Sequence, residues 1–343
     1  MDTSERSRKW LFYTFLGIRC TRRNLHIPDT GQETTEEHRR EYITSTWPVA
    51  SAGAHVAVCV CVQPSDIDQL SNDEIMELRN KGRKLHPNSG VVKVTPTTVA
   101  KVSQDLDEDA ADASEANALD LLFAETTIPV PRVRRVVKRQ WDFLIFMDYI
   151  PGQTLAHVWP KISTWQKICM AFTLRRYIRQ LRRLKASSTT PPGPLSAHGP
   201  RRCESPIFGQ VKSDRGPFAS CFDLSAFFNE RHGMAMDAKK VPQDDPSRND
   251  LFDNSEPLVL THQDFNLRNI ILGDDGRLWI VDWAWAGYYP PWFEYVAMKR
   301  QNEEESISGT NDPFWKAMVP FICGPHFRQE SRLLRMSQGL YFA

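Results

Sequence analysis

Four polar residues stand close together in one stretch of the chain, between residues 261 and 295. His262 comes two residues before Asp264, and Asn269 and Asp282 follow. Carboxylate and amide oxygens are the hard ligands that Mg²⁺ accepts, and this ion is usually held by one or two carboxylates together with substrate phosphates. A carboxylate that is not needed for the metal can orient a hydroxyl group and accept its proton. These residue types therefore indicate a metal site beside a general base.

A β-hairpin is expected to bring these groups together. The apolar runs 270–272 and 278–281 are typical of short strands, and Asp274-Asp275-Gly276 between them is a turn signal, because glycine tolerates a positive φ. Pairing of the two strands would place Asn269, at the start of one, near Asp282, at the end of the other. The sequence therefore predicts that side-chain oxygens converge at one strand end.

The spelling H-x-D-x-x-x-x-N, followed by an aspartate at a strand end, is the catalytic-loop pattern of protein kinases. His262-Gln263-Asp264 with Asn269, then Asp282-Trp283 and an aromatic segment ending in Glu294-Tyr295, resemble the aminoglycoside phosphotransferase-like family, whose relatives include choline kinases. In that family Asp-Trp stands where protein kinases have Asp-Phe-Gly. The resemblance is closest to uncharacterised fungal members and runs from about residue 70 to the C-terminus.

This resemblance implies roles for the polar residues. Asp264 would be the catalytic base. His262 is also counted among the catalytic residues, although it would brace the loop more than transfer protons. Asn269, also counted as catalytic, would hold Mg²⁺ together with Asp282, and the ion would bridge phosphate oxygens of ATP or GTP. Glu294 resembles a family glutamate that anchors its segment structurally.

A second group of candidates precedes this stretch and concerns the nucleotide. Residues 91–94 and 98–102 read as a strand pair in which Val99 and Lys101 face the same side. The resemblance makes that side the nucleotide cleft, so Val99 would contact the adenine and Lys101 the α- and β-phosphates. Lys93, in the preceding strand, is the competing candidate. No glycine is assigned to phosphate binding, since the sequence has no GxGxxG loop and the resemblance does not require one.

A predicted helix over residues 105–125 favours Lys101 over Lys93. Its acidic first turns suit the positive end of the helix dipole. Glu115 shares the apolar, inward stripe of this helix and would need a cation there, which Lys101 could supply. The alternative is that Glu115 is one more surface acid.

The hinge between the lobes is also expected from the resemblance. A second strand pair falls between residues 133 and 147, and the following segment resembles the family's hinge. Backbone groups of Asp148, Tyr149 and Ile150 would therefore bond the adenine edge.

The expected fold class is α+β, a two-lobed protein-kinase-like fold with a small β-rich N-lobe and a larger, mainly helical C-lobe. The expected divisions are an N-terminal extension over residues 1–65, the nucleotide-binding N-lobe over 66–150, and the C-lobe over 151–343. Residues 54–62, in the extension, form either a strand or a buried segment. A helix is expected over 66–85, capped by Ser71 or Asn72.

The C-lobe is expected to start with a long helix from Ser163 or Thr164 to about Lys185. Its apolar stripe includes Phe172, and its arginines, from Arg175 to Arg183, are expected to form a solvated face. Residues 235–256 are polar and expected to be mobile. The aromatic residues after Asp282 either line an acceptor cleft or pack the helical lobe, and packing is preferred for Trp292 and Phe293.

Composition limits the possible partners and the compartment. The chain has 343 residues, with 43 Lys and Arg against 42 Asp and Glu, and this balance argues against a nucleic-acid binder. Its 7 cysteines form no CxxC pair, which is typical of a reduced intracellular chain. The apolar run at residues 10–18 is too short to span a bilayer and has no small-residue cleavage site after it, so a signal peptide is the weaker alternative. We therefore expect a cytoplasmic protein that binds neither nucleic acid nor membrane.

The predicted activity is transfer of the γ-phosphoryl group of ATP or GTP to a hydroxyl of a small molecule. The sequence does not name this acceptor, and no acidic cluster of the kind an aminoglycoside needs stands near the aromatic run. One alternative is a non-catalytic kinase-like binding or scaffold protein. Another is a protein kinase, against which the Asp-Trp pair and the lack of an Ala-Pro-Glu segment argue.

Overall fold

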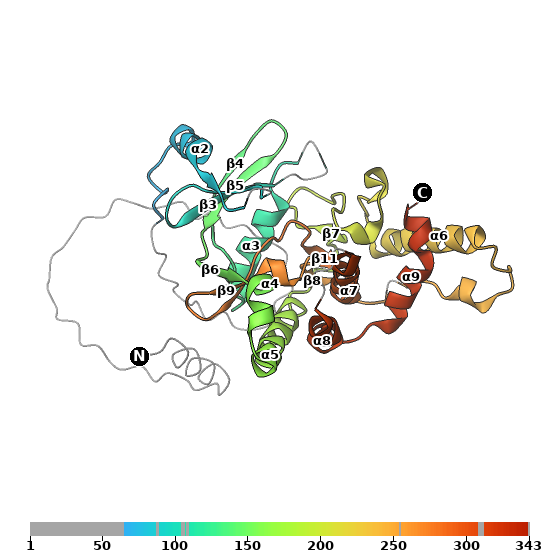
Figure 1. Ribbon diagram of the computed structural model, residues 1–343. Coiled ribbons are helices and arrows are strands. Elements are labelled where there is room, and N and C mark those ends of the chain that lie inside the picture. Colours follow the sequence, from blue (N-terminus) through green and yellow to red (C-terminus); the bar gives the residue numbers. More distant parts are fainter. Residues whose placement is uncertain are drawn as a thin grey trace. The chain divides into compact units, whose positions relative to one another are not determined.

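The computed structural model describes residues 65–86, 89–103, 107, 110–253, 255–307 and 312–341 (Figure 1). All of these residues belong to one compact unit of the chain, Pro48–Ala343. The expectations for residues 1–64, including the segment 54–62, lie outside the described residues. The predicted divisions of the chain at residues 65 and 150 stay a prediction.

The small lobe is built on a five-stranded antiparallel sheet. Its strands follow the order β1-β2-β3-β5-β4, with the bounds β1 (Arg83–Lys84), β2 (Val91–Lys93), β3 (Thr98–Ser103), β4 (Val133–Lys138) and β5 (Phe143–Asp148). Strand β5 reads Phe-Leu-Ile-Phe-Met and is buried over its apolar length because both faces of the sheet are covered. Its even-numbered residues, Leu144 and Phe146, join a cluster with Ile67 and Ile75, whereas Ile145 joins the main core with residues of helix α3 (Ser114–Glu125).

The two helices of this lobe are both shorter than the sequence predicts. Helix α2 spans Asn72–Lys81, and Ser71 caps it in a reciprocal capping box with Glu74, as one of the two expected caps. Helix α3 spans Ser114–Glu125, so the prediction that it starts at residue 105 is wrong. Only Glu115 is acidic in its first turn. Asp112, which the sequence places inside the helix, instead accepts hydrogen bonds from Arg201.

The large lobe is mainly helical. Its helices are α4 (Leu155–Val158), α5 (Thr164–Leu181), α6 (Cys221–Ala238), α7 (Trp292–Ile307), α8 (Pro313–Cys323) and α9 (Phe327–Tyr341). Helix α5 packs against α8, and α6 against α9. Ser163 starts α5 with a capping box to Gln166, as one of the two predicted caps, and the helix ends at Leu181, four residues before the expected Lys185. None of the helices in the described part of the chain is both long and apolar enough to span a membrane.

Two small sheets position the loops of this lobe. One has the order β10-β9-β6, with β6 (Gly152–Thr154), β9 (Ile270–Gly273) and β10 (Leu278–Ile280). The other has the order β7-β11-β8, with β7 (Gly193–Pro194), β8 (Val259–Thr261) and β11 (Gly287–Tyr289). Together with the small lobe, they complete the two-lobed, kinase-like α+β fold that the sequence predicts, and this prediction is confirmed.

Helix α5 corrects two expectations about its faces. Phe172 is 49% exposed and does not belong to the core stripe, although its ring meets the edge of Phe321. Arg175 and Arg182 do not form a solvated face, because they donate to the backbone carbonyls of Phe321 and Cys323 at the end of α8. These arginines therefore help to hold α8 on α5.

The segment from residue 235 to residue 256 is more ordered than its polar composition predicts. Helix α6 continues to Ala238, and a 3₁₀ turn, Pro246–Asn249, follows. Asp250 then accepts hydrogen bonds from three arginines of α9, which are Arg328, Arg332 and Arg335. Because the fixed charge of Asp250 meets these three cations, the segment is held against α9.

The aromatic residues after Asp282 mostly pack the helical lobe. Trp283, Tyr289, Trp292, Phe293 and Tyr295 are each 5% exposed or less. The rings of Tyr289 and Phe293 stack at 4.8 Å, and those of Trp292 and Phe293 lie 4.2 Å apart. The packing interpretation is therefore the correct one for these five residues.

Candidate active site

The stretch that carries the polar residues folds as the predicted hairpin. After β8 the chain forms a loop and a 3₁₀ turn, Leu267–Asn269, and then enters β9. Strands β9 and β10 pair in antiparallel fashion, with Ile270 opposite Ile280. The amide of Val281 donates to the carbonyl oxygen of Asn269 at 3.0 Å. The hairpin therefore ties the backbone of Asn269 to the residue just before Asp282.

Asp264 lies between two asparagine amides. Nδ2 of Asn266 donates to Oδ1 of Asp264 and Nδ2 of Asn269 donates to its Oδ2, both at 2.7 Å. Burial and then the negative charge of Asp282 raise the pKa of Asp264 to about 7, against the opposing effect of these hydrogen bonds. The carboxylate is thus held in one orientation and exchanges its proton near neutral pH.

His262 is fully buried and both of its ring nitrogens bind backbone. Nε2 lies 3.0 Å from the carbonyl oxygen of Val281, which requires the proton to be on Nε2, and Nδ1 accepts the amide of Asp264 at 3.1 Å. Burial lowers the pKa of His262 to about 4. The imidazole is therefore neutral and joins the catalytic loop to the end of β10, which agrees with a bracing role.

Glu294, in the first turn of α7, anchors the same loop through hydrogen bonds to its backbone. Its Oε2 accepts the amide of His262 at 2.6 Å, and its Oε1 accepts the amide of Gln263 at 3.3 Å. Gln263 has a φ of 64°, a left-handed conformation that is uncommon for a residue other than glycine. Burial raises the pKa of Glu294 to about 7. The hydrogen bonds from the amides of His262 and Gln263 to Glu294 hold the loop in this strained conformation.

A cluster of three charged residues joins the small lobe to the hairpin. The ammonium of Lys101 on β3 lies 2.7 Å from both carboxylate oxygens of Glu115 and 2.6 Å from Oδ1 of Asp282. Burial alone would lower the pKa of Lys101, but the two carboxylates outweigh this and hold the pKa above its ordinary value. Oε1 of Glu115 also accepts the amide of Trp283 at 3.1 Å. Glu115 is buried, so the alternative that it is a surface acid is wrong.

The residues expected to hold a cation fit a Mg²⁺ ion in their chemistry. The Nδ2 group of Asn269 is committed to Asp264, which leaves its Oδ1 as an acceptor. Lys101 keeps the pKa of Asp282 below its ordinary value in spite of burial, so this carboxylate is charged. Asp282 has a φ of 66°, a strained conformation that sets the direction of its side chain. No cluster of three or more His, Cys, Asp or Glu side chains suited to a metal occurs among the described residues.

Hydrogen bonds within the protein leave fewer hinge amides available to contact adenine. The amide of Asp148 donates to the carbonyl of Arg132 at 3.0 Å, and the amide of Tyr149 donates to that of Thr97 at 2.7 Å. These hydrogen bonds lie at the end of the sheet, and they leave neither amide free to donate to adenine. Within the described part of the chain no acceptor engages the amide of Ile150.

Val99 and Lys93, which the sequence offered for the nucleotide site, lie in different environments. Val99 is 5% exposed and packs in the main core with Ile145 and Met147. The ammonium of Lys93 lies 3.6 Å above the ring of Tyr149. Lys101, not Lys93, is therefore the lysine that pairs with Glu115.

Sequence reasoning missed Asn266 and a strap that reaches α3. Asn266 caps the 3₁₀ turn as well as orienting Asp264, and no motif marks it as different from any other loop asparagine. The strap, residues 195–202 of the large lobe, includes Arg201, whose Nη1 donates to the carbonyl of Asp112 at 2.7 Å. Asp112 comes three residues before Glu115, so the strap fixes the start of the helix that carries this glutamate.

Comparison with known proteins gives one family. The model of the family described as "Phosphotransferase enzyme family" matches residues 88–308. No curated protein matches the chain in sequence.

Three solved structures illustrate how distant the similar folds are. An aminoglycoside-3'-phosphotransferase of type VIII has a TM-score of 0.45 and 16% identity, over 78% of this chain and 98% of that chain. Aminoglycoside phosphotransferase APH(4)-Ia has a TM-score of 0.45 and 13% identity, over 78% of this chain and 90% of that chain. APH(3'')-Id from Streptomyces rimosus, in complex with ADP and streptomycin, has a TM-score of 0.39 and 16% identity, over 74% of this chain and 90% of that chain.

Proposed function

Because the chain belongs to the phosphotransferase enzyme family, we propose that it transfers the γ-phosphoryl group of ATP or GTP to a hydroxyl group of a small molecule. The observation that carries this proposal is the position of Asp264, held by two asparagine amides in the same hairpin that presents Asp282 to Lys101. A proton acceptor and the aspartate that meets the lysine of the small lobe thereby belong to one short stretch of chain. The N-lobe, residues 66–150, binds the nucleotide, and the C-lobe, residues 151–343, carries the catalytic loop and the acceptor pocket.

The nucleotide is held by groups of both lobes. The adenine contacts Val99 and the hinge, where Ile150 donates its amide. Lys101 contacts the α- and β-phosphates, and Glu115 fixes the position of the ammonium. Asn269 and Asp282 would hold Mg²⁺, which supplies charge neutralisation at the phosphate oxygens when it is bound.

Asp264 orients the acceptor hydroxyl and takes its proton. A pKa near 7 suits this role, because a base of this strength is partly ionised at neutral pH and still binds a proton well. Asn266 and Asn269 keep both carboxylate oxygens in place during the transfer. His262 and Glu294 act as positioning residues, since His262 joins the loop to the end of β10 and Glu294 accepts two backbone amides of the loop.

The proposal is tested with purified protein and two site variants. Mg²⁺ with ATP or GTP should raise the melting temperature, and a metabolite extract should yield products heavier by one phosphoryl group in mass spectrometry. Asp264→Ala should reduce transfer by about 10²- to 10⁴-fold while the nucleotide shift persists. Asp282→Asn should weaken the magnesium-dependent shift itself.

A matched control is available in the turn of the same hairpin. Asp274 is exposed, and Asp274→Ala should leave both the nucleotide shift and the transfer unchanged. Failure of the unmodified protein to show any magnesium-dependent nucleotide shift would instead support a non-catalytic binding or scaffold protein.

A further inference from the structure

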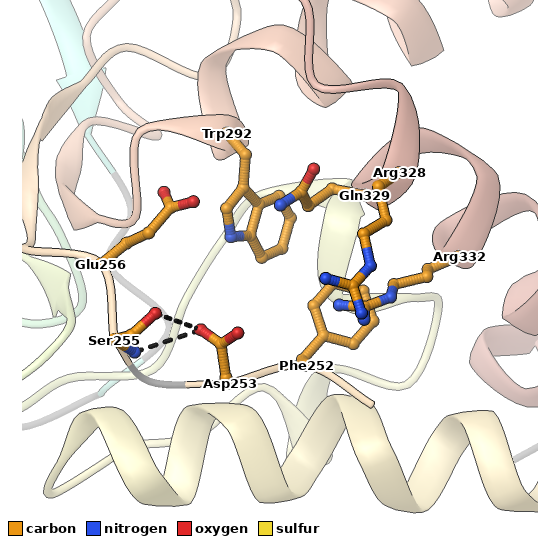
Figure 2. A pocket seen from close by; sticks show the side chains of 8 residues that line it. All are labelled: Phe252, Asp253, Ser255, Glu256, Trp292, Arg328, Gln329 and Arg332. Carbon is orange, nitrogen blue, oxygen red and sulfur yellow. Dashed lines mark hydrogen bonds between the residues drawn. The ribbon is translucent and has the colours of Figure 1, made fainter. Parts of the chain in front are cut away.

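A hollow lies in the helical lobe, and none of the residues that line it is assigned to the phosphotransfer site. Figure 2 shows it between the segment that precedes β8 and the helices α7 and α9. It has about 430 Å³ of empty space, counting the part that is open to solvent. Its lining consists of two aromatic rings, two acids, two arginines and two neutral polar residues, namely Phe252, Trp292, Asp253, Glu256, Arg328, Arg332, Ser255 and Gln329.

One end of this pocket carries an excess of positive charge. Asp250 accepts hydrogen bonds from Arg332 at 2.5 Å, from Arg328 at 2.9 Å, and from Arg335. A single carboxylate cannot neutralise three guanidinium groups. Arg332 is 2% exposed, and its Nε–H is buried without a hydrogen-bond acceptor among the described residues. This end therefore suits an anionic group.

The opposite end carries an excess of negative charge. Among the residues that the structure describes, Oδ1 of Asp253 accepts only the amide and hydroxyl of Ser255, at 3.2 and 2.6 Å (Figure 2). Within the described residues no hydrogen bond or ion pair engages the carboxylate of Glu256, and burial and then the charge of Asp253 raise its pKa against the opposing charge of Arg182. Among the described residues no hydrogen bond or ion pair joins either acid to the arginines of the pocket, although the positive charges of Arg332 and Arg328 help to lower the pKa of Asp253. This end therefore suits a cationic group.

An aromatic wall joins the two ends. The rings of Phe252 and Trp292 lie 5.3 Å apart, and the guanidinium of Arg332 lies 5.1 Å from the centre of the Phe252 ring. In Figure 2 the Trp292 ring stands between Glu256 and the arginines. An aromatic face next to a carboxylate is a favourable surface for an ammonium group and for the methylenes that follow it.

We propose that this pocket binds a small zwitterion, whose carboxylate pairs with Arg328 and Arg332 and whose ammonium lies beside Glu256 and Trp292. A ligand with both charges satisfies both ends at once, whereas a simple anion or cation leaves one end uncompensated. The site is independent of the proposed phosphotransfer, because it shares no residue with the nucleotide and acceptor groups.

The test uses a graded series of ω-amino acids, from glycine to 6-aminohexanoate, which varies the distance between the two charges. Binding to the full-length protein is measured by isothermal titration calorimetry, without nucleotide. One or more members of the series should bind, and the matched singly charged compounds, butyrate and butylamine, should bind at least about tenfold more weakly, because each lacks one charged contact. Equal binding of butyrate, or no binding by any member, would overturn the proposal.

Variants at the two ends separate the site from a general effect of charge. Arg328→Gln and Glu256→Gln should each weaken binding of the best zwitterion by about tenfold. Arg335→Gln is the matched control, because Arg335 shares Asp250 but does not line the pocket. Loss of affinity in Arg335→Gln equal to that in Arg328→Gln would show that the pocket lining does not determine binding.

Discussion

The ammonium of Lys101 lies 2.7 Å from both carboxylate oxygens of Glu115, in a pair that joins the central sheet of the small lobe to helix α3. The Glu115 side chain is 1% exposed and that of Lys101 is 14% exposed. A charge buried to this degree needs its partner, since an uncompensated ion in the protein interior costs several kcal/mol. The same ammonium reaches Asp282, so the pair also joins the small lobe to the hairpin.

The two residues of this pair are expected to depend on each other for stability. Lys101→Met leaves the Glu115 carboxylate buried without its cation, and Glu115→Gln removes the main partner of Lys101. Each single variant should lower the free energy of unfolding by about 3 kcal/mol. The double variant should lose at least about 1 kcal/mol less than the sum of the singles in urea unfolding.

Lys93→Met is the control for this cycle, because the Lys93 ammonium lies over the ring of Tyr149 and has no buried carboxylate to leave behind. Its effect should stay below about 1 kcal/mol. Strict additivity of Lys101→Met and Glu115→Gln would contradict the pairing.

The activity should depend on pH through Asp264. Its pKa in the folded protein is raised to about 7, so the carboxyl is protonated below this pH and cannot accept the hydroxyl proton. In the free enzyme kcat/KM should therefore rise with pH up to about 7. The same shift makes the folded state lose stability as pH rises from the unfolded pKa of 3.8 to about 7, because the unfolded chain ionises first.

Asn266 gives a sharper version of the same experiment. Asn266→Asp would place a second carboxylate at the position that now donates to Oδ1 of Asp264, and like charges raise a pKa. The midpoint of the pH profile should move upward, with transfer at neutral pH reduced. Asn80→Asp on α2, which is exposed, should leave the midpoint where it is. An unchanged profile in Asn266→Asp would mean that Asp264 does not control the rate.

Glu294 is expected to support the catalytic loop by accepting two backbone amides. Glu294→Ala leaves the amides of His262 and Gln263 buried without acceptors, at a cost of about 1–3 kcal/mol each. Glu294→Gln keeps an acceptor oxygen and should cost less. Because the pKa of Glu294 is raised to about 7, the wild type should lose stability relative to Glu294→Gln as pH rises from 4.5 to about 7. Chemical unfolding across this range tests both statements.

The strap from the large lobe should control the affinity for the nucleotide. Arg201→Ala removes the two hydrogen bonds to Asp112 and frees the start of α3, which carries Glu115. KM for the nucleotide should rise about tenfold, with a smaller change in kcat. Arg202→Ala, which breaks only an exposed pair to Asp107 at 3.6 Å, should have a much smaller effect. If Arg201→Ala lowered the free energy of unfolding and left KM unchanged, the strap would have a structural role and no role in nucleotide affinity.

Much of the site could be predicted because its residues are encoded locally. Lys101 faces the core side of its strand through the two-residue period, and Glu115 shares the apolar stripe of its helix through the 3.6-residue period. The Asp-Gly turn sets the register that brings Asn269 to the end of β10. These patterns act within a few residues, so local preference and the final fold agree.

Other features depended on contacts between segments far apart in the sequence. Glu294 reaches a loop 32 residues earlier, Arg201 reaches Asp112 across 89 residues, and Asp250 meets Arg332 across 82 residues. The acids near residue 107 read as the first turns of a helix, but Asp107 and Asp112 bind arginines of the strap instead. Phe172 continues an apolar stripe and is nevertheless exposed, because α8 covers only part of that face.

The sequence by itself identified the candidate site residues of this protein, since His262, Asp264, Asn269 and the strand-end Asp282 need only one hairpin to converge. Tertiary structure alone decided what holds that hairpin in place and where the pocket between α7 and α9 lies. The physical reason is that hydrogen bonds and ion pairs between distant segments form only after the lobes have packed, and no local pattern records which partner each buried charge will meet.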